Sequence, residues 1–551
     1  MSVQKSSGDH EKGLSLHGTT NLDEIEAPVT LKAYLMCVMA SFGGFFFGYD
    51  AGYINGVTGS PIFIELIEGA GATSLTTPHN SLIVSILSVG TFFGAIIAGD
   101  FADFTGRKPT IITGCVVYII GVILQTASSG LGLLVAGRLI AGLGVGFVSA
   151  IVILYMSEIC PKKVRGAMVS GYQFCITLGI LTASIVNYAV QNRNDSGQYR
   201  IPVGVQFAAG LILGIGMLFL PESPRYFVKR GDVDGAAACL AKLRSQPIDS
   251  HYIQNELAEI VANNEIELAH MPADGWIGAW KICFSGSLWN GASNIRRVIL
   301  GTSLQMMQQW TGVNFIFYFS TPFLQATGAV KNPFIISLIF TLVNVCSTPI
   351  SFYTIERFGR RTLLIYGAAG MLICQLLVGI IGVTIGFNKT HTIDGKDVPV
   401  NLGAVNAQVA FIAIFIFFFA STWGPGAWVL IGEIFPLPIR ARGVALSTSS
   451  NWLWNTIITV ITPYMVGKDK GNLKSSVFFI WGGLCACALV YSYYLVPETK
   501  GLSLEQIDQM LSETTPRTSA GWKPTQTFAA EAGMNANGEL KEKSEYVERA
   551  L

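Results

Sequence analysis

A cluster of amides lies among aromatic residues in one apolar stretch of the chain. Gln308, Gln309 and Asn314 each donate and accept hydrogen bonds, while Trp310 and Tyr318 add flat ring faces. Amides are costly inside a bilayer unless a polar partner meets them. The combination suits a neutral polyhydroxyl ligand and therefore predicts a sugar site. The alternative is that these amides only bond neighbouring helices to one another.

A single carboxylate is the second candidate for chemistry. Asp50 lies well inside an apolar stretch, where an ionisable residue indicates a function, and Arg138 in another apolar stretch is its expected partner. A conformational change that separates the two would change the proton affinity of Asp50. The residue could then take up a proton on one side of a membrane and release it on the other. The alternative is a permanent ion pair that holds two helices together.

Other kinds of chemistry have little support in the sequence. The chain has no set of nucleophile, base and orienting group, no metal-ligating cluster and no phosphate-binding loop, so we expect no enzyme and no cofactor. The ten cysteines are scattered without CxxC spacing, which predicts neither disulfides nor a metal site. A net charge of +1 gives no reason to expect a nucleic-acid partner.

The elements that position these residues are membrane helices. Of 551 residues, 51% are hydrophobic and only 13% are charged, as in a polytopic membrane protein. Twelve apolar stretches are long enough to cross a bilayer. They run at about Leu31 to Val57, Ser81 to Phe101, Thr110 to Ala127, Leu131 to Met156, Ala167 to Val190, Ile201 to Leu220, Val298 to Phe323, Phe334 to Ile355, Thr362 to Ile385, Ala404 to Ile434, Ala445 to Val466 and Val477 to Val496.

The remaining segments are polar. We expect a tail at 1–28 without a cleavable signal, a six-helix bundle at 29–220, a linker of short cytosolic helices at 221–297, and a second six-helix bundle at 298–496. A C-terminal segment at 497–551 ends in a tail that is expected to be disordered from Glu513 onward.

Basic residues set the orientation, because they gather in alternate loops and positive charge favours the cytosol. Both termini are therefore expected in the cytosol, although Lys468, Lys470 and Lys474 in the last outer loop weaken the bias. Two glycosylation sequons, at Asn194 and Asn388, lie in loops that this topology places outside.

Three motifs recur in the same order in the second half of the chain. Asp103-Phe-Thr-Gly-Arg-Lys108 is echoed by Glu356-Arg-Phe-Gly-Arg-Arg361, Glu158-Ile-Cys-Pro by Glu433-Ile-Phe-Pro, and Pro221-Glu-Ser-Pro by Pro497-Glu-Thr. Such repeats predict an all-α fold of two related six-helix halves with a pathway between them.

With FGYDAGYINGV, PESPRY, QQWTGVNFIFYFS, ERFGRRTL and VPETKGLSLEQI, these motifs resemble the sugar porter family of the major facilitator superfamily, and most of all fungal monosaccharide transporters. The resemblance implies the major facilitator fold, alternating access and a functional monomer. It also implies a set of sugar-binding residues: Gln173, Gln308, Gln309, Asn314, Tyr318, Trp428 and Asn451. Ile180 replaces a second glutamine that some bacterial members have, so a pentose preference does not carry over.

The helix that carries the amide cluster needs a break. At about 100° per residue, Gln309 and Asn314 lie a net 140° apart and cannot face one point on a straight helix. Unwinding at Gly312 would let both reach one ligand. The alternative is that Gly312 only allows close helix packing.

Charged residues near the inner mouth are expected to form a gate, because acidic residues are interleaved with the anchoring arginines. The resemblance implies ion pairs that break and form as the halves rock. The gate residues are Arg107, Glu158, Arg165, Glu222, Arg225, Arg360, Glu433, Arg440 and Glu498.

These features together predict a plasma-membrane symporter of protons and a hexose such as glucose. The alternatives are an energy-independent hexose facilitator and a glucose sensor that signals through its tail. Only about forty residues follow Leu511, which favours transport over sensing. The sequence does not rank glucose against other monosaccharides.

Overall fold

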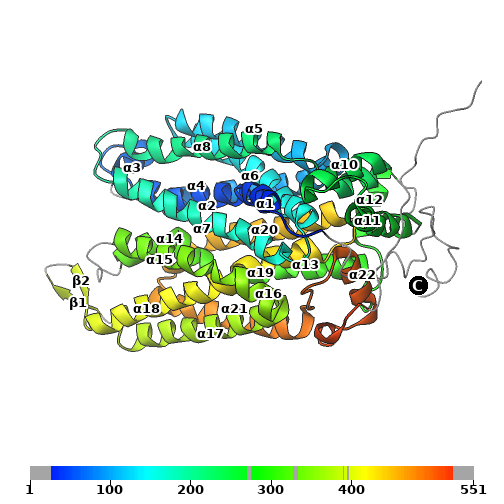
Figure 1. Cartoon of the computed structure of the whole chain (residues 1–551). Coiled ribbons are helices and arrows are strands. Elements are labelled where there is room, and N and C mark those ends of the chain that lie inside the picture. The colour runs from blue at the N-terminus through cyan, green and yellow to red at the C-terminus, as the bar shows by residue number, and fades with distance from the viewer. Residues whose placement is uncertain are drawn as a thin grey trace, which may run out of the picture.

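The computed structural model describes residues 27–72, 74–269, 275–326, 333–388, 390–393, 396–467 and 470–524. In these ranges the chain is almost entirely helical and forms two halves that lie side by side (Figure 1). Every predicted span corresponds to a long helix or to a pair of helices with a short break. The all-α membrane fold is therefore confirmed.

The first half contains the helices before residue 220. They are α1 (Leu31–Ser41), α2 (Gly43–Val57), α3 (Pro61–Glu68), α4 (Thr77–Thr105), α5 (Arg107–Thr126), α6 (Leu131–Ile159), α7 (Arg165–Val190) and α8 (Gly197–Phe219). Helices α2 and α7 pack especially closely, because a Cβ on Gly48 would stand 1.9 Å from the backbone oxygen of Ile176. Only glycine fits there, so Gly48 allows the close packing of the two helices.

The second half is built from more interrupted helices. They are α13 (Asn294–Trp310), α14 (Val313–Ala326), α15 (Pro333–Ser347), α16 (Ile350–Phe358), α17 (Arg360–Thr384), α18 (Leu402–Phe418), the π-helix η2 (Phe419–Trp423), α19 (Gly424–Glu433), α20 (Arg440–Val466), the short η3 (Lys474–Ser476) and α21 (Val477–Leu495). Helices α15 and α16 meet at 43°. Pro349 lies at this bend, where its missing N–H interrupts the helical hydrogen bonds.

The short helices gather at one end of the molecule, which we name the charged end. They are α9 (Pro224–Lys229), α10 (Val233–Arg244), α11 (His251–Ala269), α12 (Gly275–Cys283) and α22 (Leu504–Glu513). Figure 1 shows them together on the right. The prediction of a helical linker is confirmed.

Among the described residues, nine helices are long and apolar enough to cross a membrane, and the bent pair α15 and α16 would make ten. The other two predicted spans are the pair α13 and α14, and α20. Both are the more polar ones, since they carry amides such as Gln308 and Asn451. Their polarity therefore marks the helices that face a site between the halves.

Two details differ from the expected all-helical chain with a disordered tail. A small antiparallel hairpin joins β1 (Thr390–Ile393) to β2 (Lys396–Pro399) at the end opposite the charged end. Beyond Glu513, residues 514–524 pack against the charged end and contain the short helix η4 (Ser519–Gly521). Ser519 Oγ accepts a hydrogen bond from the Glu498 backbone N–H at 2.8 Å, which ties this segment down.

Candidate functional site

A partly open central cavity lies between the two halves, with about 470 Å³ of empty space including open solvent. Its walls come from both halves: Phe47, Ala51, Gln173, Ile176 and Ile180 from the first, and Gln308, Gln309, Val313, Asn314, Phe317, Tyr318, Asn344, Phe419 and Trp428 from the second. Six of the seven residues predicted to bind sugar line this one cavity. Among these six, the structure brings together amides and aromatic rings from segments up to 255 residues apart, from Gln173 to Trp428.

The helix break predicted at Gly312 is confirmed. Helix α13 ends at Trp310 and α14 begins at Val313, and Gly312 between them has φ +83°, a conformation that favours glycine. The Thr311 backbone oxygen, freed by the break, accepts a hydrogen bond from Gln375 Nε2 at 3.3 Å. The two amides expected to need the break now meet, because Asn314 Nδ2 donates to Gln309 Oε1.

Gln308 is held at both ends of its amide. Its Nε2 donates to the backbone oxygens of Trp423 and Gly424, at 3.1 and 3.0 Å, where the π-helix η2 passes into α19. Its Oε1 accepts from Asn451 Nδ2 at 2.8 Å. Gln308 therefore fixes the position of the wall formed by η2 and α19, and its hydrogen bonds explain a buried amide in this helix.

Asn451 is the one predicted sugar-binding residue that does not line the cavity. It is fully buried, and its Nδ2 donates to Gln305 Oε1 at 2.7 Å as well as to Gln308. Since both contacts are to protein, Asn451 positions Gln308 from behind. The sequence alone could not separate this role from direct contact, because both need an amide facing the pathway.

Gln173 and Trp428 face each other across the boundary between the halves. A Cβ on Gly424 would stand 3.2 Å from Gln173 Cδ, so this glutamine lies directly against the start of α19. The ring of Tyr172 meets the ring of Trp428 edge to face, with centroids 5.4 Å apart. One flat face and one amide thus approach the cavity from opposite halves, an arrangement that suits a sugar ring.

Eight of the cavity residues were not predicted to bind sugar, and Asn344 and Phe419 are two of them. Asn344, in α15, has a buried side-chain oxygen without a hydrogen-bond partner among the described residues, and Phe419 begins the π-helix. Asn344 could have been predicted as a cavity residue from the presence of an amide in the apolar run LVNVCS. Ile180 lies in the cavity wall, where its apolar side chain offers no hydrogen bond.

Asp50 and Arg138 are paired loosely inside the first half. Arg138 Nη2 lies 3.8 Å from Asp50 Oδ2, too far for a hydrogen bond, and Arg138 Nη1 instead bonds the hydroxyl of Tyr53. Both side chains are buried, and Asp50 Oδ1 has no hydrogen-bond partner among the described residues. The pairing of the two residues is as expected, and one carboxylate oxygen is left available.

The repeated motifs form the same arrangement in each half. Arg107 binds Glu158 through Nε and Nη2, both at 3.0 Å, while Glu222 accepts from the backbone N–H groups of Arg107 and Lys108. In the second half Arg360 binds Glu433 at 3.2 and 2.8 Å in the same manner. Glu498 accepts from the N–H groups of Arg360 and Arg361 at 2.8 and 3.1 Å. Each half thus has a bidentate ion pair and a carboxylate at a helix N-terminus, where negative charge is favourable.

Further contacts join the two halves at the charged end. Arg442 Nε lies 2.8 Å from Asp100, and its Nη1 lies 2.9 Å from Asp103. The backbone N–H of Ala167 donates to Glu356 at 3.2 Å. The sequence predicted that acidic and basic residues would be interleaved here, but it did not predict which residues of the two halves would pair with each other.

Helix α22 adds a second bridge. Glu505 pairs with Arg225 of α9, and Asp508 pairs with Arg297 of α13. Burial raises the pKa of Glu505, but Arg225 outweighs it and lowers the pKa to about 2, so this carboxylate is charged. Helix α22 begins within the motif VPETKGLSLEQI, which did not by itself predict these ion pairs.

Arg165 and Arg440 differ from the other predicted gate residues in this structure. Neither forms an ion pair within the described ranges. Arg440 Nε donates to the Phe435 backbone oxygen at 2.8 Å, and its Nη1 and Nη2 have no hydrogen-bond partner there. The carboxylates nearby are taken by Arg107 and Arg225, which explains why these two arginines are left over.

Comparisons with known proteins agree with this geometry. The model of the Sugar (and other) transporter family matches residues 36–511. The chain is 43% identical to the major facilitator-type transporter ecdD of Aspergillus rugulosus, over 89% of this chain and 90% of that one. It is 41% identical to the probable glucose transporter rco-3 of Neurospora crassa, over 87% and 79%.

Among solved structures, the fold matches the proton:xylose symporter XylE bound to 6-bromo-6-deoxy-D-glucose, with a TM-score of 0.72 at 23% identity. The match covers 87% of this chain and 99% of that one. These relatives are transporters and not enzymes. The chain therefore belongs to the Sugar (and other) transporter family and is a sugar transporter of the major facilitator superfamily.

Proposed function

We propose that the protein carries a hexose, with glucose as the first candidate, and that the central cavity is the binding site. The observation that supports this most is the cavity wall, where amides from both halves surround a space bounded by aromatic rings. Gln173, Gln309 and Asn314 would bond sugar hydroxyls, while Trp428 and Tyr318 would pack against the ring. The name of the Neurospora crassa relative agrees with glucose as the substrate.

Access to the cavity would alternate between the two ends of the molecule. The contacts of Arg442 and of helix α22 hold the halves together at the charged end, so these must break before the cavity opens there. We place the charged end in the cytosol, because its loops carry most of the arginines. The protein would work as a monomer in the plasma membrane, since each chain has its own cavity.

Proton coupling through Asp50 is the finer part of the proposal. Asp50 lies in helix α2 next to Ala51, which lines the cavity, so a sugar bound in the cavity would change the surroundings of the carboxylate. Asp50 Oδ1 has no hydrogen-bond partner among the described residues, and Oδ2 lies 3.8 Å from Arg138, so the carboxylate could bind a proton without first breaking a hydrogen bond to Arg138. The same pair also supports the second candidate, a facilitator in which Asp50 and Arg138 only join two helices.

Uptake in cells that lack their own hexose carriers tests the proposal. Added glucose should enter, acidify the cytosol and stop entering when a protonophore collapses the gradient. Asp50→Asn should lose accumulation but keep exchange of labelled glucose across the membrane. Asp195→Asn is the matched control, because Asp195 is exposed and its ion pair is with the exposed Arg193. Unchanged initial uptake without a gradient would leave the facilitator, and sugar binding without any uptake would favour the sensor.

Glycosylation would follow from the proposed orientation. Asn194 is exposed, whereas the side-chain oxygen of the partly buried Asn388 accepts a hydrogen bond from Ser475 N–H at 3.0 Å. We therefore assign Asn194 as the acceptor. Endoglycosidase treatment should change the mobility of the protein, and Asn194→Gln should abolish this change while Asn388→Gln leaves it.

A further inference from the structure

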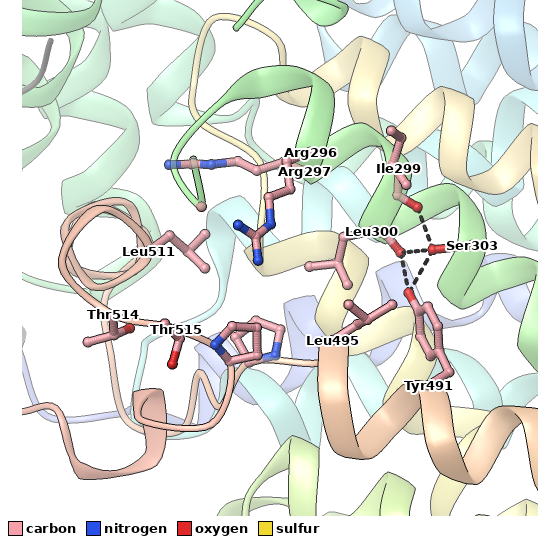
Figure 2. A pocket seen from close by; sticks show the side chains of 13 residues that line it. Arg296, Arg297, Ile299, Leu300, Ser303, Tyr491, Leu495, Leu511, Thr514 and Thr515 are labelled. Atoms are coloured by element: carbon pink, nitrogen blue, oxygen red, sulfur yellow. Dashed lines mark hydrogen bonds between the residues drawn. The ribbon is translucent and has the colours of Figure 1, made fainter. Parts of the chain in front are cut away.

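A second cavity lies at the charged end of the second half, away from the central one. It is partly open and has about 570 Å³ of empty space, including open solvent, between the ends of α13 and α21 and the segment that follows α22 (Figure 2). Ile299, Leu300, Leu495 and Leu511 form much of its wall. The cavity is therefore mainly apolar, although it lies where the chain leaves its membrane helices.

One end of this cavity is positively charged. Figure 2 shows the guanidinium of Arg297 pointing into it between Leu300 and Leu511. Arg297 is only 4% exposed and pairs with Asp508, yet its Nε has no hydrogen-bond partner among the described residues. Arg296 also lines the cavity, and its Nη1 donates to the Trp289 backbone oxygen at 3.0 Å, so two guanidinium groups and one carboxylate lie at this end and the local charge favours an anion.

The other polar groups of the cavity are already satisfied. The hydroxyls of Tyr491 and Ser303 lie 2.8 Å apart, and Tyr491 donates to the Leu300 backbone oxygen at 2.9 Å (Figure 2). No further donor is needed there, so this part of the wall presents apolar surface. A ligand that fits has an anionic group at one end and an apolar part at the other.

The surroundings of the cavity have the composition of a membrane–water interface. Trp289 is 92% exposed, Tyr493 and Tyr494 are half exposed, and the Arg517 guanidinium stacks 4.4 Å from the Tyr494 ring. Such aromatic and basic residues gather at lipid headgroups. Leu495, at the end of α21, is itself about half exposed, so the apolar wall continues onto the lipid-facing surface.

We propose that this cavity binds an anionic phospholipid from the leaflet at the charged end. The phosphate would lie at Arg296 and Arg297, and the upper part of one acyl chain would lie along Ile299, Leu300 and Leu495. The lipid would then bridge α13, α21 and the segment after α22. The inference depends on the membrane fold and not on which sugar is carried or on proton coupling.

The full-length protein, purified in mixed micelles of phosphatidylserine and phosphatidylcholine, tests this by native mass spectrometry of the lipids that it retains. We expect phosphatidylserine to be retained preferentially, and Arg296→Gln to lower its retention about fivefold, as the loss of one cation at a headgroup predicts. Leu300→Trp should lower it as well by filling the cavity. Arg230→Gln, an exposed arginine at the charged end of the first half, is the matched control and should change nothing.

Three results would overturn the proposal. They are equal retention of both lipids by the unchanged protein, unchanged phosphatidylserine retention by Arg296→Gln, and competition by glycerophosphate as strong as that by the lipid. The last would mean a site for simple anions. Arg296 is partly exposed and Arg296→Gln should therefore fold, which gel filtration and glucose binding check independently.

Discussion

Replacing Gly312 by alanine tests whether the broken helix creates the sugar site. Gly312 has φ +83°, and a Cβ placed on it would lie 2.6 Å from Cγ and 2.9 Å from Cβ of Trp481. Trp481 is buried and cannot swing away. The substitution must therefore strain the break or shift it, and either change moves Gln309 relative to Asn314.

The size of the effect can be estimated from these contacts. Holding alanine in the left-handed region costs roughly 1–2 kcal/mol, and overpacking against a buried ring costs roughly 1–3 kcal/mol. If the chain relieves this strain by straightening, Asn314 rotates away from the cavity. The loss of one or two hydrogen bonds to sugar, at about 1 kcal/mol each, would raise the Kd about 5- to 30-fold.

Sugar binding to the purified protein, measured by titration calorimetry, gives the result without depending on transport. Gly483→Ala is the matched control, because Gly483 lies on the same helix as Trp481 and a Cβ there meets nothing within 4 Å. Gly312→Ala should bind glucose more weakly while Gly483→Ala binds normally. Normal affinity and normal thermal stability in Gly312→Ala would refute the idea that the break forms the site.

Three further predictions concern the supporting contacts. Asn451→Ala should weaken glucose binding by about 1–3 kcal/mol, because it leaves the side-chain oxygens of Gln305 and Gln308 unpaired. Titration calorimetry with glucose measures this loss. A loss of affinity no greater than that caused by replacing a surface asparagine would contradict the prediction. Arg442→Gln and Asp100→Asn should show a coupling of about 0.5–3 kcal/mol in a double-mutant cycle of thermal stability, whereas additive effects would mean that their 2.8 Å contact contributes nothing. The pKa of Glu505 lies near 2, below its unfolded value of 4.5, so the stabilisation that its pair with Arg225 gives to α22 is present above about pH 4.5 and is lost as pH falls toward 2. Proteolytic release of the C-terminal segment should therefore rise as pH falls through that window. Glu505→Gln should remove this contribution to the pH dependence.

Much of the site could be predicted, because an amide buried in an apolar span is energetically unfavourable without a partner and such amides can be read directly from the sequence. An amide in an apolar span needs a partner, and two amides 140° apart on one helix need a break between them. Gly312 was the residue able to provide it, and the structure has the break there. The repeated motifs predicted two related halves, the resemblance implied ion pairs at the inner mouth, and each half has one such pair, Arg107 with Glu158 and Arg360 with Glu433.

The remainder depends on contacts between distant parts of the chain. Arg442 meets Asp100 across 342 residues, and neither lies in a pattern that selects the other. Asn344 could not be told from an amide that bonds a neighbouring helix, since both occur in apolar runs. The π-helix at Phe419–Trp423 has hydrogen bonds one residue longer than those of an α-helix, and no sequence pattern used above indicates it.

The cavity and the charged end are linked by short stretches of rigid helix. On α19, Trp428 lines the cavity and Glu433 binds Arg360, and five residues of helix span about 7.5 Å. On α7, Gln173 lines the cavity and the Ala167 N–H bonds Glu356, over about 9 Å. These two helices meet where Tyr172 packs on Trp428. A sugar that draws Gln173 and Trp428 together must therefore also move both ends of the ion-pair network. If the proposed site and gate are correct, binding and opening would be coupled over less than two turns of each helix, without a longer path through the protein.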